Sequence, residues 1–235
     1  MSFTFTDLVQ LYEKKKEDYG IDTYRHISEI LKEAKVLHKK YFMTLDKIDH
    51  EQSWRAFKGK NLEKLLVHIL TDEVHDLGLK ISSGNILERT SSSQLDKILD
   101  RVKRNLLVDY GEFGMHLPDV DLIIFDPFDG YVLAVVSIKV TLRERIAQTG
   151  YWKLKLSAAP VTKDIKVYFI TPDEDGTLSI KKPTKKARAI VENDIDGSYI
   201  MSEINIEESN HVKKFDKFIS DIKIISEARS NINSK

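Results

Sequence analysis

One aspartate and one lysine stand at the two ends of a pair of apolar segments in the middle of the chain. Pro118 and Asp119 precede the first segment, and Lys139 ends the second. A carboxylate is a hard oxygen ligand of the kind that Mg²⁺ prefers, and a neighbouring lysine can orient or deprotonate water and offset charge that develops on phosphorus. If the two segments pair, the sequence predicts a site that hydrolyses a phosphodiester.

The two segments are typical of paired β-strands. Residues 120–126 and 131–139 are short runs rich in β-branched residues, and the turn residues Pro-Phe-Asp-Gly at 127–130 join them. This pattern predicts an antiparallel hairpin with both strands buried. Because a hairpin brings its two free ends together, we expect Asp119 to lie close to Lys139.

The site needs a further acid, because Ser137 occupies the place where a second carboxylate would be most useful. Glu63 is the first candidate, since it lies on a predicted helix whose apolar stripe should pack on the sheet. Glu144 is nearer in sequence, but it stands between two arginines, where an ion pair is the simpler explanation. Asp121 points to the same side of its strand as Asp119 and is therefore an alternative ligand.

These residues resemble the signature of a known family. The segment LPDVDLIIFDPFDGYVLAVVSIKVTLRERIAQ at 117–148 is similar to the PD-(D/E)XK nucleases, in the branch of type II restriction endonucleases whose active-site strand holds a small residue, any residue and Lys before a Thr-Leu-Arg-Glu-Arg run. The segment RAFKGKNLE at 55–63 is similar to the helix that gives those enzymes a further acid. The resemblance covers residues 55–173.

The resemblance implies catalytic roles for Asp119, Lys139, Glu63 and Ser137, the last replacing the usual acid. It implies that Asp119, Glu63 and the backbone of Ile138 bind the metal ion. Its implied cofactor is Mg²⁺, and its implied substrate is double-stranded DNA, cut at a short specific site.

The resemblance also implies DNA contacts from residues that follow the catalytic lysine along the chain. These are Arg143, Arg145, Gln148 and Lys153. Cutting both strands normally takes two active sites, so we expect a homodimer.

Composition excludes several other classes of protein. The 235 residues carry 37 Lys and Arg against 37 Asp and Glu, so the net charge of zero excludes a histone-like binder. Hydrophobic residues make up 41% of the chain, enough for a real core. Cysteine is absent, which excludes disulfide scaffolds, thiolate zinc sites and cysteine nucleophiles. Without a long apolar segment or a secretory signal, we expect a cytoplasmic protein that does not enter a membrane.

Charge is nevertheless unevenly distributed along the sequence. Residues 136–166 hold seven basic residues against two acids, and KKPTKKAR at 181–188 adds five more basic residues without an acid. Residues 191–209 hold six acids and no basic residue. This uneven distribution of charge predicts that one side of the protein binds the phosphates along DNA.

Hydrophobic periodicity predicts the elements around the hairpin. The expected helices include one that begins near Asp22 and others at 51–78, 93–106 and 142–156, and a terminal helix over 215–222; the further strands are expected at 166–170, 188–191 and 198–201. This order predicts an α/β fold, with a restriction-endonuclease-like mixed sheet flanked by helices. We expect a helical N-terminal subdomain at 1–50 and a nuclease core at 51–235 that ends in the terminal helix.

Three functions agree with these observations. The first is a type II restriction endonuclease. The second is a repair, junction-resolving or mobile-element nuclease of the same superfamily, and the third is a nonenzymatic DNA-binding protein that kept the fold. The Thr-Leu-Arg-Glu-Arg run at 141–145 favours the first.

Overall fold

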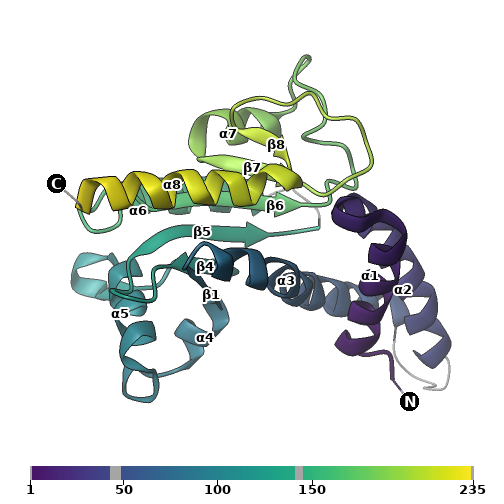
Figure 1. Cartoon of the computed structure of the whole chain (residues 1–235), viewed down its shortest axis with the longest axis horizontal. Helices are drawn as coiled ribbons and strands as arrows, with labels where there is room; N and C mark the ends of the chain where they lie inside the picture. Colours follow the sequence, from purple (N-terminus) through teal and green to yellow (C-terminus); the bar gives the residue numbers. More distant parts are fainter. Residues whose placement is uncertain (1, 43–48, 141–144, 234–235) are drawn as a thin grey trace.

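The computed structural model describes residues 2–42, 49–140 and 145–233, and its centre is a mixed sheet of six strands (Figure 1). The strands follow one another across the sheet in the order β1 (Lys80–Ser83), β4 (Leu122–Phe125), β5 (Val132–Ile138), β6 (Lys166–Thr171), β7 (Gly197–Ile200) and β8 (Val212–Lys214). β4 is antiparallel to both β1 and β5, whereas β5 to β8 are parallel. The predicted hairpin and mixed sheet are therefore confirmed. Two short strands, β2 (Val108–Asp109) and β3 (Met115–His116), pair separately.

Helices cover both faces of the sheet. One face packs against α1 (Phe5–Tyr19), α2 (Ile27–Phe42), α3 (His50–Asp76) and α8 (Phe218–Asn233). The other face packs against α4 (Gly84–Arg89), α5 (Lys97–Leu106), α6 (Arg145–Ser157) and α7 (Lys186–Asp194). No helix within the described ranges is long and apolar enough to cross a membrane.

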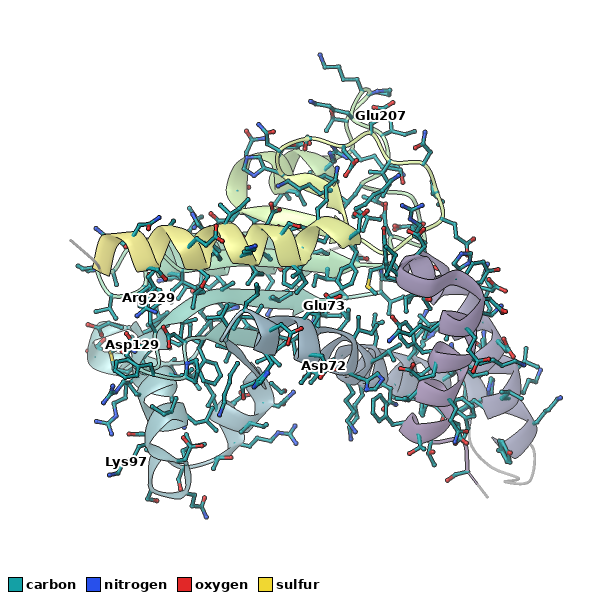
Figure 2. The ribbon with its side chains drawn as sticks, in the orientation of Figure 1. Asp72, Glu73, Lys97, Asp129, Glu207 and Arg229 are labelled. Atoms are coloured by element: carbon teal, nitrogen blue, oxygen red, sulfur yellow. The ribbon has the colours of Figure 1, made fainter. Side chains whose placement is uncertain are left out.

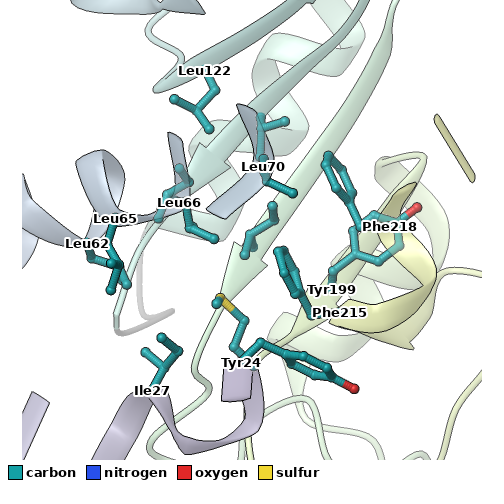
Figure 3. Packing of buried hydrophobic residues seen from close by; sticks show 14 of the residues in the cluster. Tyr24, Ile27, Leu62, Leu65, Leu66, Leu70, Leu122, Tyr199, Phe215 and Phe218 are labelled. Atoms are coloured by element: carbon teal, nitrogen blue, oxygen red, sulfur yellow. The ribbon is translucent and has the colours of Figure 1, made fainter. Parts of the chain in front are cut away.

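The long helix α3 forms because its sequence carries both a cap and a continuous apolar stripe. The Asp49 side chain accepts a hydrogen bond from the Glu51 backbone N–H at 2.9 Å, which satisfies one free donor at the helix start. Leucines recur at helical spacing and pack toward β4 and the start of α8 (Figure 3). Glu63 follows buried Leu62, so it lies at the margin of the stripe. Gly59 leaves the helix unbroken.

The turn of the central hairpin is fixed by the terminal helix. The guanidinium of Arg229 on α8 donates to the carboxylates of Asp126 and Asp129, at the two ends of the turn (Figure 2). The same guanidinium lies 4.2 Å from the centre of the Tyr131 ring. This clamp holds the closed end of the hairpin, while its open end faces the opposite side of the molecule.

One hydrophobic cluster joins the N-terminal helices to the sheet. It runs from Leu8 on α1 and Ile30 on α2, through Leu66 on α3, to Val136 on β5 and Phe218 on α8. The core is therefore continuous across residue 50, and the division into a subdomain and a nuclease core stays a prediction.

Three of the sequence expectations differ from the structure. The strand expected at 188–191 is wrong, because these residues belong to α7, where the buried Arg188 bonds Glu192 one turn later and the carbonyls of Leu178 and Glu207. The helix expected from residue 93 begins at Lys97, because Asp96 caps it. Strand β1 was missed because it has only four residues, two of them serines.

The junction between β1 and α4 depends on a glycine. A Cβ on Gly84 would lie 1.9 Å from the Val120 carbonyl oxygen, far inside any normal contact. The Gly84 backbone N–H donates to the Asp121 carbonyl at 2.9 Å. This close approach of two backbone segments brings the end of β1 against the start of β4.

We expect Gly84→Ala to lower the free energy of unfolding by at least about 1–3 kcal/mol, the usual cost of forcing extra atoms into a packed site. Gly59→Ala is the matched control: an added Cβ there meets nothing within 4 Å, and alanine favours a helix interior by roughly 0.5–1 kcal/mol. Urea unfolding of both variants measures the difference. A Gly84→Ala protein as stable as the parent would show that the close approach is not required.

Candidate active site

Three strand ends meet at one edge of the sheet because β4 is antiparallel to both of its neighbours. Ser83 at the end of β1 pairs with Leu122 at the start of β4, which pairs with Val136 near the end of β5. The residues just beyond this row, Asp121 and Lys139, are thereby brought to the same place.

Asp121 and Lys139 form the centre of the site. The Lys139 ammonium lies 2.9 Å from Oδ1 and 2.7 Å from Oδ2 of Asp121. The Ile138 backbone N–H also donates to Oδ2, at 2.6 Å. Both side chains are largely buried, with exposed fractions of 23% for the lysine and 14% for the aspartate. The carboxylate is therefore held in one orientation by a charged and a neutral donor.

The structure places Asp119 elsewhere. Its side chain is exposed and accepts a hydrogen bond from Gln148 Nε2 on α6 at 2.7 Å. Asp121 is the residue whose backbone N–H still bonds to the Val136 carbonyl, so it is held by the hairpin, whereas Asp119 lies two residues further out. The sequence placed Asp119 beside Lys139 and kept Asp121 as the alternative, whereas the structure brings Asp121 to the lysine.

Glu63 reaches the same centre from α3. Its Oε1 accepts a hydrogen bond from the Ser83 hydroxyl at 2.8 Å. Burial raises the pKa of Glu63, the negative charge of Asp121 acts in the same direction, and the Ser83 hydrogen bond and Lys139 oppose the rise. The structure thus brings Glu63 close enough to Asp121 and Lys139 for the charges of both to act on its pKa.

This donor set fits a divalent cation. Two carboxylates and one lysine leave a net negative charge in a partly desolvated place, and oxygen donors suit Mg²⁺. The Ile138 carbonyl can join them, because the N–H and C=O of one strand residue point to the same side and its N–H already points at Asp121.

The centre opens into a groove of about 1890 Å³. Its lining includes Glu63, Asp121, Ile138 and Lys139, together with residues from α3 and from the β1–α4 segment. Ser137 is buried and is not one of the described residues that line the groove. The site therefore has room for an extended polymer that passes over its acids.

The residues predicted to contact DNA do not lie together in the structure's described part. Arg143 and Glu144 lie outside the described residues, and Arg145 begins α6 without a described side chain. Gln148 is exposed on α6. Lys153 is largely buried and forms an ion pair with Asp196 at 2.7 Å, so the structure gives it a partner within the protein.

A second group of metal-ligating side chains lies apart from the groove. Nδ1 of His26 is 2.9 Å from a Glu203 oxygen and 3.2 Å from a Glu29 oxygen. Lys15 already pairs with Glu29 at 2.6 Å. We therefore interpret this group as an ion-pair network that ties α2 to the loop before β8.

Comparison with known proteins decides the family. Residues 98–222 match the family model described as BsaWI restriction endonuclease type 2. The chain is 35% identical over 223 residues to a putative type II restriction enzyme, MjaVIP, of Methanocaldococcus jannaschii, and the match covers 92% of each protein. The chain belongs to the BsaWI family of type II restriction endonucleases. A probable type II restriction enzyme of Helicobacter pylori, HpyAORF263P, is 40% identical over 134 residues, 57% of this chain and 67% of that protein.

Solved structures of restriction endonucleases share the fold. The AgeI–DNA complex superimposes with a TM-score of 0.53 at 15% identity and covers 92% of this chain and 91% of that one. The PspGI–substrate DNA complex gives a TM-score of 0.51 at 16% identity over 94% and 93% of the two chains. The predicted restriction-endonuclease-like α/β fold is confirmed.

Exchanging each aspartate for asparagine should separate the two candidate positions. We expect Asp121→Asn to lower the rate of DNA cleavage at least a hundredfold, about 2.7 kcal/mol, because it removes the carboxylate from the centre of the site. We expect Asp119→Asn to cut within threefold of the parental rate. Single-turnover digestion of bacteriophage DNA measures both, and the reverse order would return the role to Asp119.

Proposed function

We propose that this restriction endonuclease hydrolyses double-stranded DNA at a short specific site with Mg²⁺ as cofactor. The contact between Asp121 and Lys139 at the end of the central hairpin, with Glu63 held nearby by Ser83, carries the proposal. The groove above these residues supports an extended substrate.

Each residue of the centre has a separate task in this proposal. Asp121, Glu63 and the Ile138 carbonyl hold Mg²⁺, which when bound supplies positive charge at the scissile phosphate and a more acidic water. Lys139, fixed by Asp121, orients the attacking water and offsets charge that grows on the phosphate oxygens. Asp121 thus takes the metal-binding role that the resemblance implied for Asp119.

The branch of the family follows from the residue two positions before the lysine. Ser137 is small and buried, so it leaves the second acid to come from the helix. We propose that the chain belongs to the branch with a small residue, any residue and Lys on the active-site strand, and that Glu63 is that second acid.

The remaining elements of the proposal concern assembly and base contacts. Cleavage of both strands requires two active sites, and a homodimer supplies them. Arg143, Arg145 and Gln148 follow the catalytic strand and contact DNA in this proposal. Lys153 stabilises the fold through Asp196 instead.

Metal dependence tests the proposed chemistry. We expect bacteriophage DNA to be cut into discrete fragments with Mg²⁺ or Mn²⁺, and to stay intact with Ca²⁺ or with a chelator. Gel electrophoresis distinguishes the alternatives, because a repair or junction nuclease would not give a fixed fragment pattern and a nonenzymatic binding protein would give no fragments. Cleavage that persists in chelator would exclude the metal mechanism.

Glu63→Gln tests the second acid, because glutamine keeps the size and the Ser83 hydrogen bond but removes the charge. We expect it to raise the Mg²⁺ concentration for half-maximal cleavage, or to lower the rate at least tenfold, about 1.4 kcal/mol.

Two controls accompany this variant. Glu73→Gln changes the same helix outside the groove lining (Figure 2) and should leave the metal titration unchanged. Glu144→Gln tests the alternative acid. A parental Glu63→Gln enzyme beside an inactive Glu144→Gln enzyme would transfer the role to Glu144.

A further inference from the structure

The groove is strongly basic although the protein has no net charge. Its lining contains eight lysines and arginines, and only three acids, of which two form the catalytic centre. The basic residues are Arg55, Lys58, Lys60, Lys64, Lys80, Arg89, Lys97 and Lys139; the acids are Glu63, Asp96 and Asp121. A groove of this kind attracts a polyanion toward the acids at its centre.

Some of these cations are already engaged within the protein. Lys139 pairs with Asp121, Lys58 lies 3.3 Å from a Glu174 oxygen, and the Lys64 ammonium lies 5.5 Å from the centre of the Phe5 ring. Their charges are partly or wholly offset, so they are poor candidates for binding phosphates.

Five other cations of the lining have no such partner among the described residues: Arg55, Lys60, Lys80, Arg89 and Lys97. Lys60, Lys80 and Arg89 lie nearer along the chain to Glu63 or Ser83 than Arg55 and Lys97 do. Lys60, Lys80 and Arg89 are exposed, and in the described part of the chain none of them forms an ion pair or a side-chain hydrogen bond. They come from α3, β1 and α4, three elements that all reach the active site. A cation without a partner in the protein loses no ion pair when it exchanges water for a phosphate.

These three cations lie on elements that border the acidic centre. Lys60 precedes Glu63 by three residues on α3, so the two side chains are neighbours on the helix surface. Lys80 begins the strand whose last residue, Ser83, holds Glu63. Arg89 ends α4, which lies apart from α1 and α2 (Figure 1) and contributes to the groove lining. A DNA strand with one phosphate at the acids therefore has neighbouring phosphates near these cations.

We propose that Lys60, Lys80 and Arg89 bind the DNA backbone on both sides of the scissile phosphate and position it over the catalytic centre. This inference rests on the proposed function. It adds to the DNA contacts of Arg143 and Arg145 a phosphate-binding surface that lies outside the basic runs at 136–166 and 181–188.

Contacts within the protein engage three cations of those runs. Lys153 and Lys166 both pair with Asp196, at 2.7 and 3.4 Å. Arg188 is fully buried and bonds Glu192. These three cations contribute to the basic charge of the runs in the sequence, but acidic side chains offset their charge in the folded protein.

The salt dependence of DNA binding tests the assignment. The variant carries Lys60→Gln, Lys80→Gln and Arg89→Gln, and the probe is a duplex of random sequence without divalent cations. Each phosphate neutralised by the protein contributes roughly 0.9 to the slope of log K against log salt. We therefore expect the slope to fall by about 0.9 for each phosphate that the variant no longer binds, with parental thermal stability. An unchanged slope would overturn the proposal.

A second triple variant has the same change in charge on the surface that the sequence favoured. It carries Lys163→Gln, Lys185→Gln and Lys186→Gln, which are exposed residues of the two basic runs. Its slope should equal that of the parent. A larger decrease in slope here than in the groove variant would assign the phosphates to the basic runs.

Two further measurements separate this inference from the proposed function. In Mg²⁺ the groove variant should keep kcat within about threefold at saturating DNA and raise KM, because it retains all catalytic side chains. A parent that binds DNA but never cuts it would refute the proposed function, while the slopes would still test the groove.

Arg89→Gln alone repeats the test with a single cation, and an unchanged slope there would remove Arg89 from the assignment.

Discussion

The carboxylate of Asp121 links the parts of the site more directly than any other group. It accepts hydrogen bonds from the Lys139 ammonium and the Ile138 backbone, while its own backbone bonds Val136 and Gly84. A lysine buried to this extent requires a charged partner, because burial of an unpaired charge is costly. The hairpin therefore aligns the aspartate, and the aspartate in turn gives the lysine a single position.

The rest of the fold holds this contact from three directions. The Arg229 clamp secures the closed end of the hairpin, and the close approach at Gly84 joins β1 to β4 near its open end. The apolar stripe of α3 packs on the same sheet and carries Glu63 to the margin where Ser83 meets it. Because rigid elements hold these side chains, the two carboxylates stay close despite their mutual repulsion.

The sequence predicted the hairpin, the lysine and the helical glutamate, because each follows from local pattern or from a motif. It favoured Asp119 and kept Asp121 as the alternative, since alternation along a strand puts both on the same side. The choice depends on where pairing with β5 ends, and a tertiary hydrogen bond from Asp121 to Val136 sets that point. The strand expected around Arg188 failed for a related reason: the bonds that hold this arginine inside come from distant segments.

The distribution of charge on the folded protein also could not be predicted from the sequence alone. A run of basic residues is easy to find in a sequence because its members are adjacent along the chain. In the fold, these adjacent side chains can pair with the same nearby acidic residues, and their charges are then offset. Asp196 engages two lysines of the first run, and the last residue of the second run is buried. Among the described residues, the groove collects its unengaged cations from α3, β1, α4 and α5, each of which supplies only one or two. Two carboxylates at the centre repel a phosphate, and in the proposed function the cations of the groove together with a bound divalent ion would reverse that repulsion. An acidic centre within a basic groove therefore attracts the DNA backbone while keeping the ligands that a metal ion needs.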